Sequence, residues 1–145
     1  MKAFHFPLQK ALDLGITQLG LEEARYKKQL FEVAELDRKR AEVEASGLRA
    51  EVQVRAWPTL ASCDLTALGN FRLRARKLEA QILTHRGEKA KEADAQYQRM
   101  LEARRRCRLL ERLKERRLAE WTSARDRELE EIAAESYLAR WSREG

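Results

Sequence analysis

Few residues in this sequence have the types and spacing that catalysis or metal binding requires. The two histidines, His5 and His85, and the two cysteines, Cys63 and Cys107, lie in different regions of the chain. None has the short spacing that brings metal ligands, or a nucleophile and its base, together. No glycine-rich phosphate loop is present either. We therefore expect a protein that is not an enzyme, with no catalytic residue, metal ligand, cofactor or small-molecule substrate.

The strongest charge feature is a basic cluster in the last third of the chain. Residues 104–117 contain seven arginines and one lysine, in a protein with a net charge of +6. Such a helix could lie along nucleic-acid phosphates, as the basic regions of leucine-zipper proteins do. It lacks their base-reading asparagine, no zipper follows it, and Glu102, Glu111 and Glu115 neutralise part of its charge. A basic coiled coil that binds nucleic acid, or a scaffold, is therefore the alternative hypothesis, and nucleic acid is not the partner we expect.

Apolar residues in the second half of the chain recur at alternating steps of three and four, which is the seam of a coiled coil. After Gly87 the series resumes one residue later, which predicts a stutter in the supercoil. A seam this narrow needs a partner helix. The series comprises Leu68, Phe71, Ala75, Leu78, Ile82 and His85, then Ala90, Ala93, Tyr97, Met100 and Cys107.

The first half of the chain supplies that partner. Its series is Leu12, Ile16, Leu19, Glu23, Tyr26, Leu30 and Val33, and it shifts to Ala41, Ala45, Leu48 and Val52. Pro58 ends this helix, because the residue before a proline is pushed out of the α region. Two long helices joined by a short loop pack antiparallel.

We therefore predict an all-α fold: a long antiparallel two-helix coiled-coil hairpin, forming a single domain over residues 1–145. The first helix covers about 8–56, the loop about 57–63, and the longer second helix about 64–142. With the turn centred near Leu60, the numbers of facing residues add up to about 120.

The second helix overhangs the first, so its last 25 or so residues have no predicted partner. Exposed apolar side chains there indicate a binding surface. The alternative is that they fold back onto Phe4 and Phe6. The overhang carries Leu118, Trp121, Leu129, Ile132, Tyr137, Leu138 and Trp141.

The sequence also indicates a location. No apolar run approaches the roughly 20 residues of a membrane-spanning helix, and the N-terminus lacks the continuous apolar segment of a signal peptide. Two distant cysteines suit a reducing compartment. We expect a cytoplasmic protein that reaches a membrane only through a partner.

Four stretches resemble the FliJ family of flagellar type III export proteins. Residues 4–14 resemble the family's F-x-F-x-L-x-x-x-L opening, residues 77–86 its second-helix segment, and residues 110–117 its C-terminal half. Residues 129–133 resemble its closing Leu/Met-Asp-Glu-hydrophobic-Ala motif, with Glu130 in place of the usual Asp. The resemblance covers nearly the whole chain.

The resemblance implies a non-enzymatic component of the export apparatus, similar to the central stalk of rotary ATPases. Such a protein binds and stimulates the hexameric export ATPase FliI and links it to the cytoplasmic domain of the export gate FlhA. A role in cycling export chaperones is implied as well. The implied location is cytoplasmic, peripheral to the inner membrane. Injectisome proteins share this plan, and the Phe-x-Phe opening favours the flagellar system.

The resemblance leads to two sets of candidate contact residues, of which Leu78 and His85 match the family's own gate-contact positions. A patch toward the tip of the hairpin contacts the gate, although Arg74 and Gln81 replace an aromatic and a small residue. The candidate gate contacts are Phe71, Leu78, Ile82 and His85; the alternative for Leu78 and Ile82 is that they only pack the seam. The candidate ATPase contacts are Phe4, Phe6, Arg112, Arg116, Arg117, Leu118, Trp121, Glu130, Glu131 and Ile132.

Overall fold

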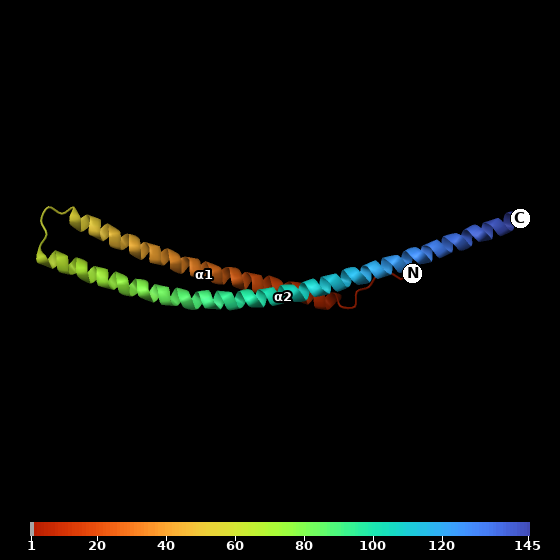
Figure 1. The fold of residues 1–145 in the computed structure, drawn as a ribbon, viewed down its shortest axis with the longest axis horizontal. Helices are drawn as coiled ribbons and strands as arrows, with labels where there is room; N and C mark the ends of the chain where they lie inside the picture. Colours follow the sequence, from red (N-terminus) through yellow and green to blue (C-terminus); the bar gives the residue numbers. More distant parts are fainter. Residues whose placement is uncertain (1) are drawn as a thin grey trace. The chain divides into compact units, whose positions relative to one another are not determined.

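The computed structural model describes residues 2–145, which form two long α-helices and no β-strand. Helix α1 comprises Gln9–Arg55, with 47 residues, and helix α2 comprises Ser62–Glu144, with 83 residues. The two helices run in opposite directions and pack against each other (Figure 1). The predicted all-α hairpin with a longer C-terminal helix is therefore confirmed.

The turn between the helices follows from local sequence. Pro58 stops α1, and the backbone N–H of Trp57 makes the last bond, to the carbonyl of Val54 at 3.2 Å. At the start of α2, the Asp64 carboxylate accepts a hydrogen bond from the backbone N–H of Ala61 at 3.0 Å. This reach from the third helical residue back to the capping residue is one half of a capping box. It makes α2 begin two residues earlier than predicted.

The contacts of the chain divide into two compact units. The turn unit comprises residues 21–100, and the terminal unit comprises residues up to Gly20 together with residues 101–145. We describe each unit by itself. The expectation of a single domain stays a prediction.

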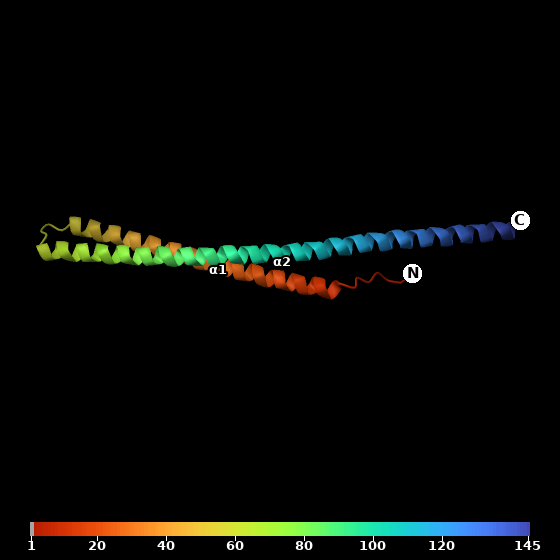
Figure 2. The same ribbon diagram turned by 60° about the horizontal axis from the view of Figure 1, so that its bottom comes forward.

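Polar pairs between the helices set the register of the turn unit. Each pair joins α1 to α2, and residues 21–55 and 62–100 lie side by side in both views (Figures 1 and 2). The rings of Tyr26 and Tyr97 also meet across the unit, with centroids 5.3 Å apart. The residue numbers of these partners add up to about 120, so the predicted register is confirmed. The ion pairs are Glu51–Arg72 at 2.7 Å, Asp37–Arg86 at 2.8 Å, Arg40–Glu79 at 3.3 Å and Glu32–Lys89 at 3.5 Å.

The inward-facing positions follow one uninterrupted heptad pattern on each helix. The least exposed residues recur at alternating steps of three and four without a change of phase. The stutter predicted after Gly87 and the shift predicted between Val33 and Ala41 are therefore wrong. On α1 the positions are Val33, Leu36, Arg40, Val43, Gly47, Ala50 and Val54; on α2 they are Ala75, Glu79, Ile82, Arg86, Lys89, Ala93, Gln96 and Met100.

Several residues predicted inside the seam lie outside it for this reason. Leu30 is 45% exposed and Leu48 is 66% exposed, whereas Leu36, which the predicted series skipped, is 8% exposed. The prediction favoured an apolar residue at every step, but polar residues occupy several steps of this seam: Arg40 on α1, and Glu79, Arg86, Lys89 and Gln96 on α2. They can do so because they pair with each other across the helices: Arg40 with Glu79, and Gln96 with both the carbonyl and the carboxylate of Glu22.

The corrected seam gives a direct stability prediction. Leu36→Ala should lower the free energy of unfolding by about 2–5 kcal/mol, because it removes a buried side chain from a packed site. Leu30→Ala is the matched control, with the same chemical change on the same helix, and should cost less than about 1 kcal/mol. Urea titrations followed by circular dichroism compare the two variants. A larger loss of unfolding free energy for Leu30→Ala than for Leu36→Ala would contradict this assignment of the seam positions.

In the terminal unit, the first turns of α1 pack on α2 through a close contact at Gly15. Leu12 is 4% exposed and Cys107 is 3% exposed. A Cβ atom at Gly15 would lie 3.3 Å from the sulfur of Cys107, which is closer than most such contacts. Glycine at this seam position therefore lets the helices approach around the Cys107 side chain.

An extended N-terminal segment continues the pairing beyond α1. Phe6 is only 4% exposed, and the ring of Phe4 lies against Trp121 with a centroid distance of 6.0 Å. The indole N–H of Trp121 donates to the backbone carbonyl of Lys2 at 3.1 Å, and the Arg125 guanidinium lies 5.2 Å from the indole centroid. We call residues 2–8 the N-terminal strap.

The strap corrects the predicted extent of the overhang. The last 25 or so residues of α2 were expected to have no partner, but the strap covers α2 as far as Trp121. Every residue of 129–145 is exposed, and we call this range the exposed tail. The overhang is therefore shorter than predicted. α2 itself does not fold back, because it is one continuous helix. Of the alternative, only the contact between Phe4 and Trp121 is observed, and the strap makes it.

Two glycines of α1 should respond differently to alanine. Gly20 has nothing within 4 Å of an added Cβ, so Gly20→Ala should raise the free energy of unfolding by up to about 1 kcal/mol through helix propensity. Gly15→Ala gives the same gain in helix propensity, but its Cβ atom would lie 3.3 Å from the Cys107 sulfur. The cost of this close contact offsets the gain in the free energy of unfolding. Thermal denaturation of the two variants measures the difference. An equal gain at both positions would mean that the Gly15 contact is loose.

Candidate functional site

A groove lies between α1 and α2 in the turn unit, and its lining includes Phe71, Leu78 and His85. It encloses about 870 Å³ and is open to solvent along one face of the hairpin. Its floor is the seam itself, formed by Leu36, Val43, Ala75 and Ile82. We call it the tip-side groove.

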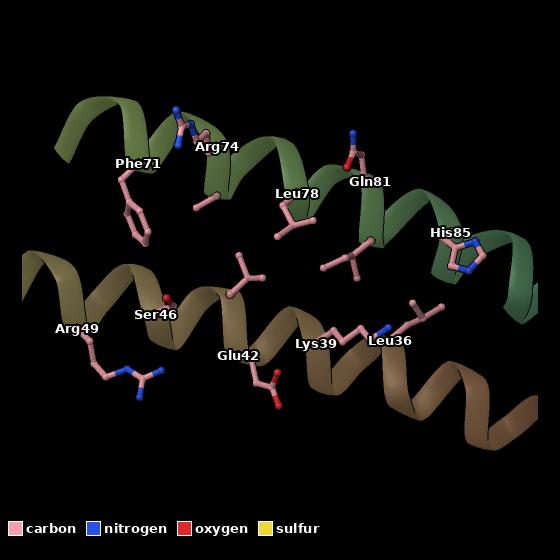
Figure 3. Close-up of a pocket in the computed structure, with 13 residues that line it drawn as sticks. Leu36, Lys39, Glu42, Ser46, Arg49, Phe71, Arg74, Leu78, Gln81 and His85 are labelled. Atoms are coloured by element: carbon pink, nitrogen blue, oxygen red, sulfur yellow. The ribbon is translucent and has the colours of Figure 1, made fainter. Parts of the chain in front are cut away.

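The α2 wall of the tip-side groove repeats every seven residues. Phe71, Leu78 and His85 therefore lie on one face of the helix. Phe71 and Leu78 point from α2 toward α1 (Figure 3), yet remain 39% and 46% exposed. Apolar surface of this kind, held on a rigid helix and open on one side, is suited to binding an apolar partner segment.

The α1 wall is polar, and cations border the groove on both sides. Lys39 and Arg49 line it from α1, and Arg74 lines it from α2. Within residues 2–145, none of these three cations forms an ion pair. An apolar strip between unpaired cations favours an amphipathic segment that has acidic residues beside its apolar ones.

Beyond His85 lies a smaller depression, bordered by Phe31 and by charged residues that include Lys89. Lys89 lies 3.3 Å from Glu92 and 3.5 Å from Glu32, and these carboxylates raise the pKa of its ammonium group. The lysine is thus held as a cation in an ion-pair network at this end.

The structure brings all four candidate gate contacts into the tip-side groove. Ile82 is 9% exposed and forms the floor, so it also packs the seam, as the alternative for this residue held. His85 is exposed and lies 3.9 Å from Glu88. Arg74 and Gln81, the two departures from the family pattern, line the groove too. The α1 wall was not anticipated; the predicted register, read across the turn, could have located it.

The candidate ATPase contacts are not gathered in one place. Phe6 is buried, and Phe4 and Trp121 are engaged with each other, so these aromatic residues are not freely exposed as expected. The remaining candidates are all exposed on α2: Arg112, Arg116, Arg117, Leu118, Glu130, Glu131 and Ile132.

Two searches of the described residues gave negative results. No cluster of three or more His, Cys, Asp or Glu side chains that could hold a metal ion occurs in residues 2–145. No helix in that range is both long and apolar enough to cross a membrane.

The two cysteines should differ in reactivity. Burial raises the pKa of the Cys107 thiol, and Glu111 adds to this shift, so the nucleophilic thiolate is disfavoured at Cys107. Cys63 is exposed at the start of α2. A thiol reagent at about pH 8 should therefore label Cys63 at least about tenfold faster than Cys107.

Cys63→Ser and Cys107→Ser variants assign the two labelling phases. Both thiols should react at similar rates in denaturant. Equal rates in the native protein would contradict the burial of Cys107.

Comparisons of the chain with protein-family models, with curated proteins and with solved structures gave no match.

Proposed function

We propose that the protein is a non-enzymatic, FliJ-like component of a type III protein export apparatus. In this role it binds and stimulates the hexameric export ATPase and contacts the cytoplasmic domain of the export gate. Cycling of export chaperones and a cytoplasmic location at the inner membrane belong to the same proposal. The observation that carries it is the tip-side groove, which brings together Phe71, Leu78, Ile82 and His85.

The gate contact is argued from the groove's shape and charge. Phe71 and Leu78 offer exposed apolar surface between Lys39, Arg49 and Arg74. A gate segment with apolar residues at helical spacing and acidic residues beside them would suit this groove. Its apolar side chains would cover the two exposed apolar residues, and its carboxylates would pair with the three cations. His85, at the far end of the same wall, would then contact the segment without contributing to the seam.

The ATPase contact is argued from the exposed part of α2. Leu129 and Ile132 are 56% and 52% exposed in the exposed tail, the part of α2 in which every residue is exposed. The cluster of residues 104–117 would steer this end toward an acidic partner. Engagement of Phe4 and Phe6 by the ring would first require release of the N-terminal strap.

The gate contact can be tested with the purified cytoplasmic domain of an FlhA-like gate protein. Leu78→Ala and His85→Ala should each weaken binding about tenfold, which corresponds to about 1.4 kcal/mol. Leu73→Ala is the matched control, because Leu73 is 62% exposed and does not line the groove. Titration calorimetry gives the affinities, and melting curves confirm that His85→Ala stays folded. Equal affinity for all three variants and the wild type would exclude the groove as the gate contact.

The ATPase contact can be tested by deleting the exposed tail, residues 129–145. The deletion should abolish stimulation of a FliI-like ATPase while leaving the strap and its contact with Trp121 in place. Leu129→Ser combined with Ile132→Ser should reproduce most of the loss. The deletion retains the basic cluster, so tight binding of duplex DNA with no effect on the ATPase would favour the nucleic-acid alternative.

A further inference from the structure

One face of α2 in the terminal unit has a charge pattern that is complementary to itself. Its residues recur at steps of three and four and therefore lie on one side of the helix. All of them are exposed. We call this face the outer stripe: Arg105, Arg108, Arg112, Arg116, Ala119, Ser123, Asp126, Glu130, Ala134 and Tyr137.

The order of steps in the outer stripe is the same in both directions. A second stripe laid antiparallel on the first therefore meets it position for position, with Ala119 facing Ser123 at the centre. Arginines occupy one half of the stripe, and carboxylates and an aromatic ring occupy the other. Antiparallel pairing thus places Arg116 opposite Asp126 and Arg112 opposite Glu130 on both sides of the centre. Small residues at the centre allow the two backbones to approach closely.

The side chains in question are available for such pairing. Within residues 2–145, Arg112, Arg116 and Glu130 form no ion pair. Asp126 accepts two hydrogen bonds from Arg125, at 3.2 Å and 2.9 Å, and both are made to Oδ1. The Oδ2 atom is therefore left for a second arginine. Arginine and carboxylate can form two parallel hydrogen bonds, which adds geometric specificity to the charge pairing.

The opposite face of α2 is already occupied. Cys107 is buried there against Gly15, and Trp121 is covered by the N-terminal strap. The outer stripe begins two residues before Cys107 and so points away from that face. A second copy on the stripe would displace neither α1 nor the strap.

We propose that two copies of this chain associate through the outer stripe of α2, antiparallel and with twofold symmetry. Each dimer has two Arg112–Glu130 pairs and two Arg116–Asp126 pairs, with Arg105 of each copy near Tyr137 of the other as a cation–π pair. Because these contacts are exposed charges, the dimer is weak and salt-sensitive. The proposal does not depend on the export role.

Sedimentation velocity of the full chain tests the proposal. The wild type should dimerise at low salt and dissociate at about 1 M salt, where the Debye length is about 3 Å. Arg112→Glu with Arg116→Glu makes the stripe wholly acidic at the four pairing positions. Asp126→Arg with Glu130→Arg makes it wholly basic. Each double variant should be monomeric at low salt, and an equimolar mixture of the two should form a heterodimer.

A matched control separates stripe contacts from net charge. Lys27→Glu with Lys28→Glu changes the net charge as the acidic variant does, but on α1, and should leave the dimer intact. The following results would each overturn the proposal: a monomeric wild type at low salt, a dimer that either stripe variant retains, or a mixture that stays monomeric. Binding of nucleic acid by a wild type that never dimerises counts among the overturning results.

Cross-linking tests the orientation in a Cys63→Ser background. A short bismaleimide should join an Ala119→Cys copy to a Ser123→Cys copy, and should join two Ala119→Cys copies at least about tenfold less. A preference for the second product would overturn the antiparallel register. Circular dichroism confirms that each variant keeps its helices.

Discussion

The packing of α1 on α2 depends on polar groups that pair inside a narrow apolar seam. Arg40 and Glu79 occupy facing seam positions and form an ion pair across it. Sliding α2 by one heptad in either direction would bring Arg40 opposite Arg72 or Arg86 instead. Like charges in a partly buried position are costly, so the observed register is favoured over its neighbours. Gln96 and Glu22 add a second polar layer of the same kind.

The seam also explains why the apolar side chains of the α2 wall of the tip-side groove stay exposed. The seam positions at Arg72, Glu79 and Arg86 are each preceded by an apolar or aromatic-ring residue of the α2 wall. One residue on a helix is a rotation of about 100°, so these preceding side chains face the edge of the interface and not its centre. The exposed α2 wall therefore follows from the position of its residues beside the seam.

The sequence was sufficient to predict the hairpin, its turn and its register. A single proline between two helical patterns fixes the connectivity, and the antiparallel arrangement then follows from loop length. Which residues face inward was predicted only at every second step over residues 12–33 and on α2, as at Leu12 and Ile82. The others were missed because Gly15 and Gln29 hold positions where Ile16 and Leu30 looked more suitable. Hydrophobic periodicity cannot anticipate a seam position that is occupied by a glutamine, or by a glycine that makes room for the Cys107 sulfur on the facing helix. The series Ala41, Ala45, Leu48 and Val52 was wrong at every step, because all four residues are exposed.

The same limit applies to the candidate site residues. The four groove residues could be named because they lie on one helix at regular spacing, whereas the α1 wall could be located only by reading the predicted register across the turn. The strap escaped prediction because its pairing joins an extended segment to a helix, and neither side carries a periodic signal for the other. Only the aromatic residues Phe4 and Trp121 indicated it, as an alternative.

The strap also acts as a ruler for the terminal unit. From Gly15, beside Cys107, to Lys2, bonded to Trp121, the N-terminal chain advances 13 residues (15 − 2) while α2 advances 14 (121 − 107). Each residue of the strap therefore covers about one residue of α2. Lengthening or shortening the strap by a single residue would move the boundary of the exposed tail by about one residue, which is a rotation of about 100° on the helix, and would change which face of α2 is presented first. A few residues beside Phe4 and Phe6 thus determine how much of a helix many residues away is left open to a partner.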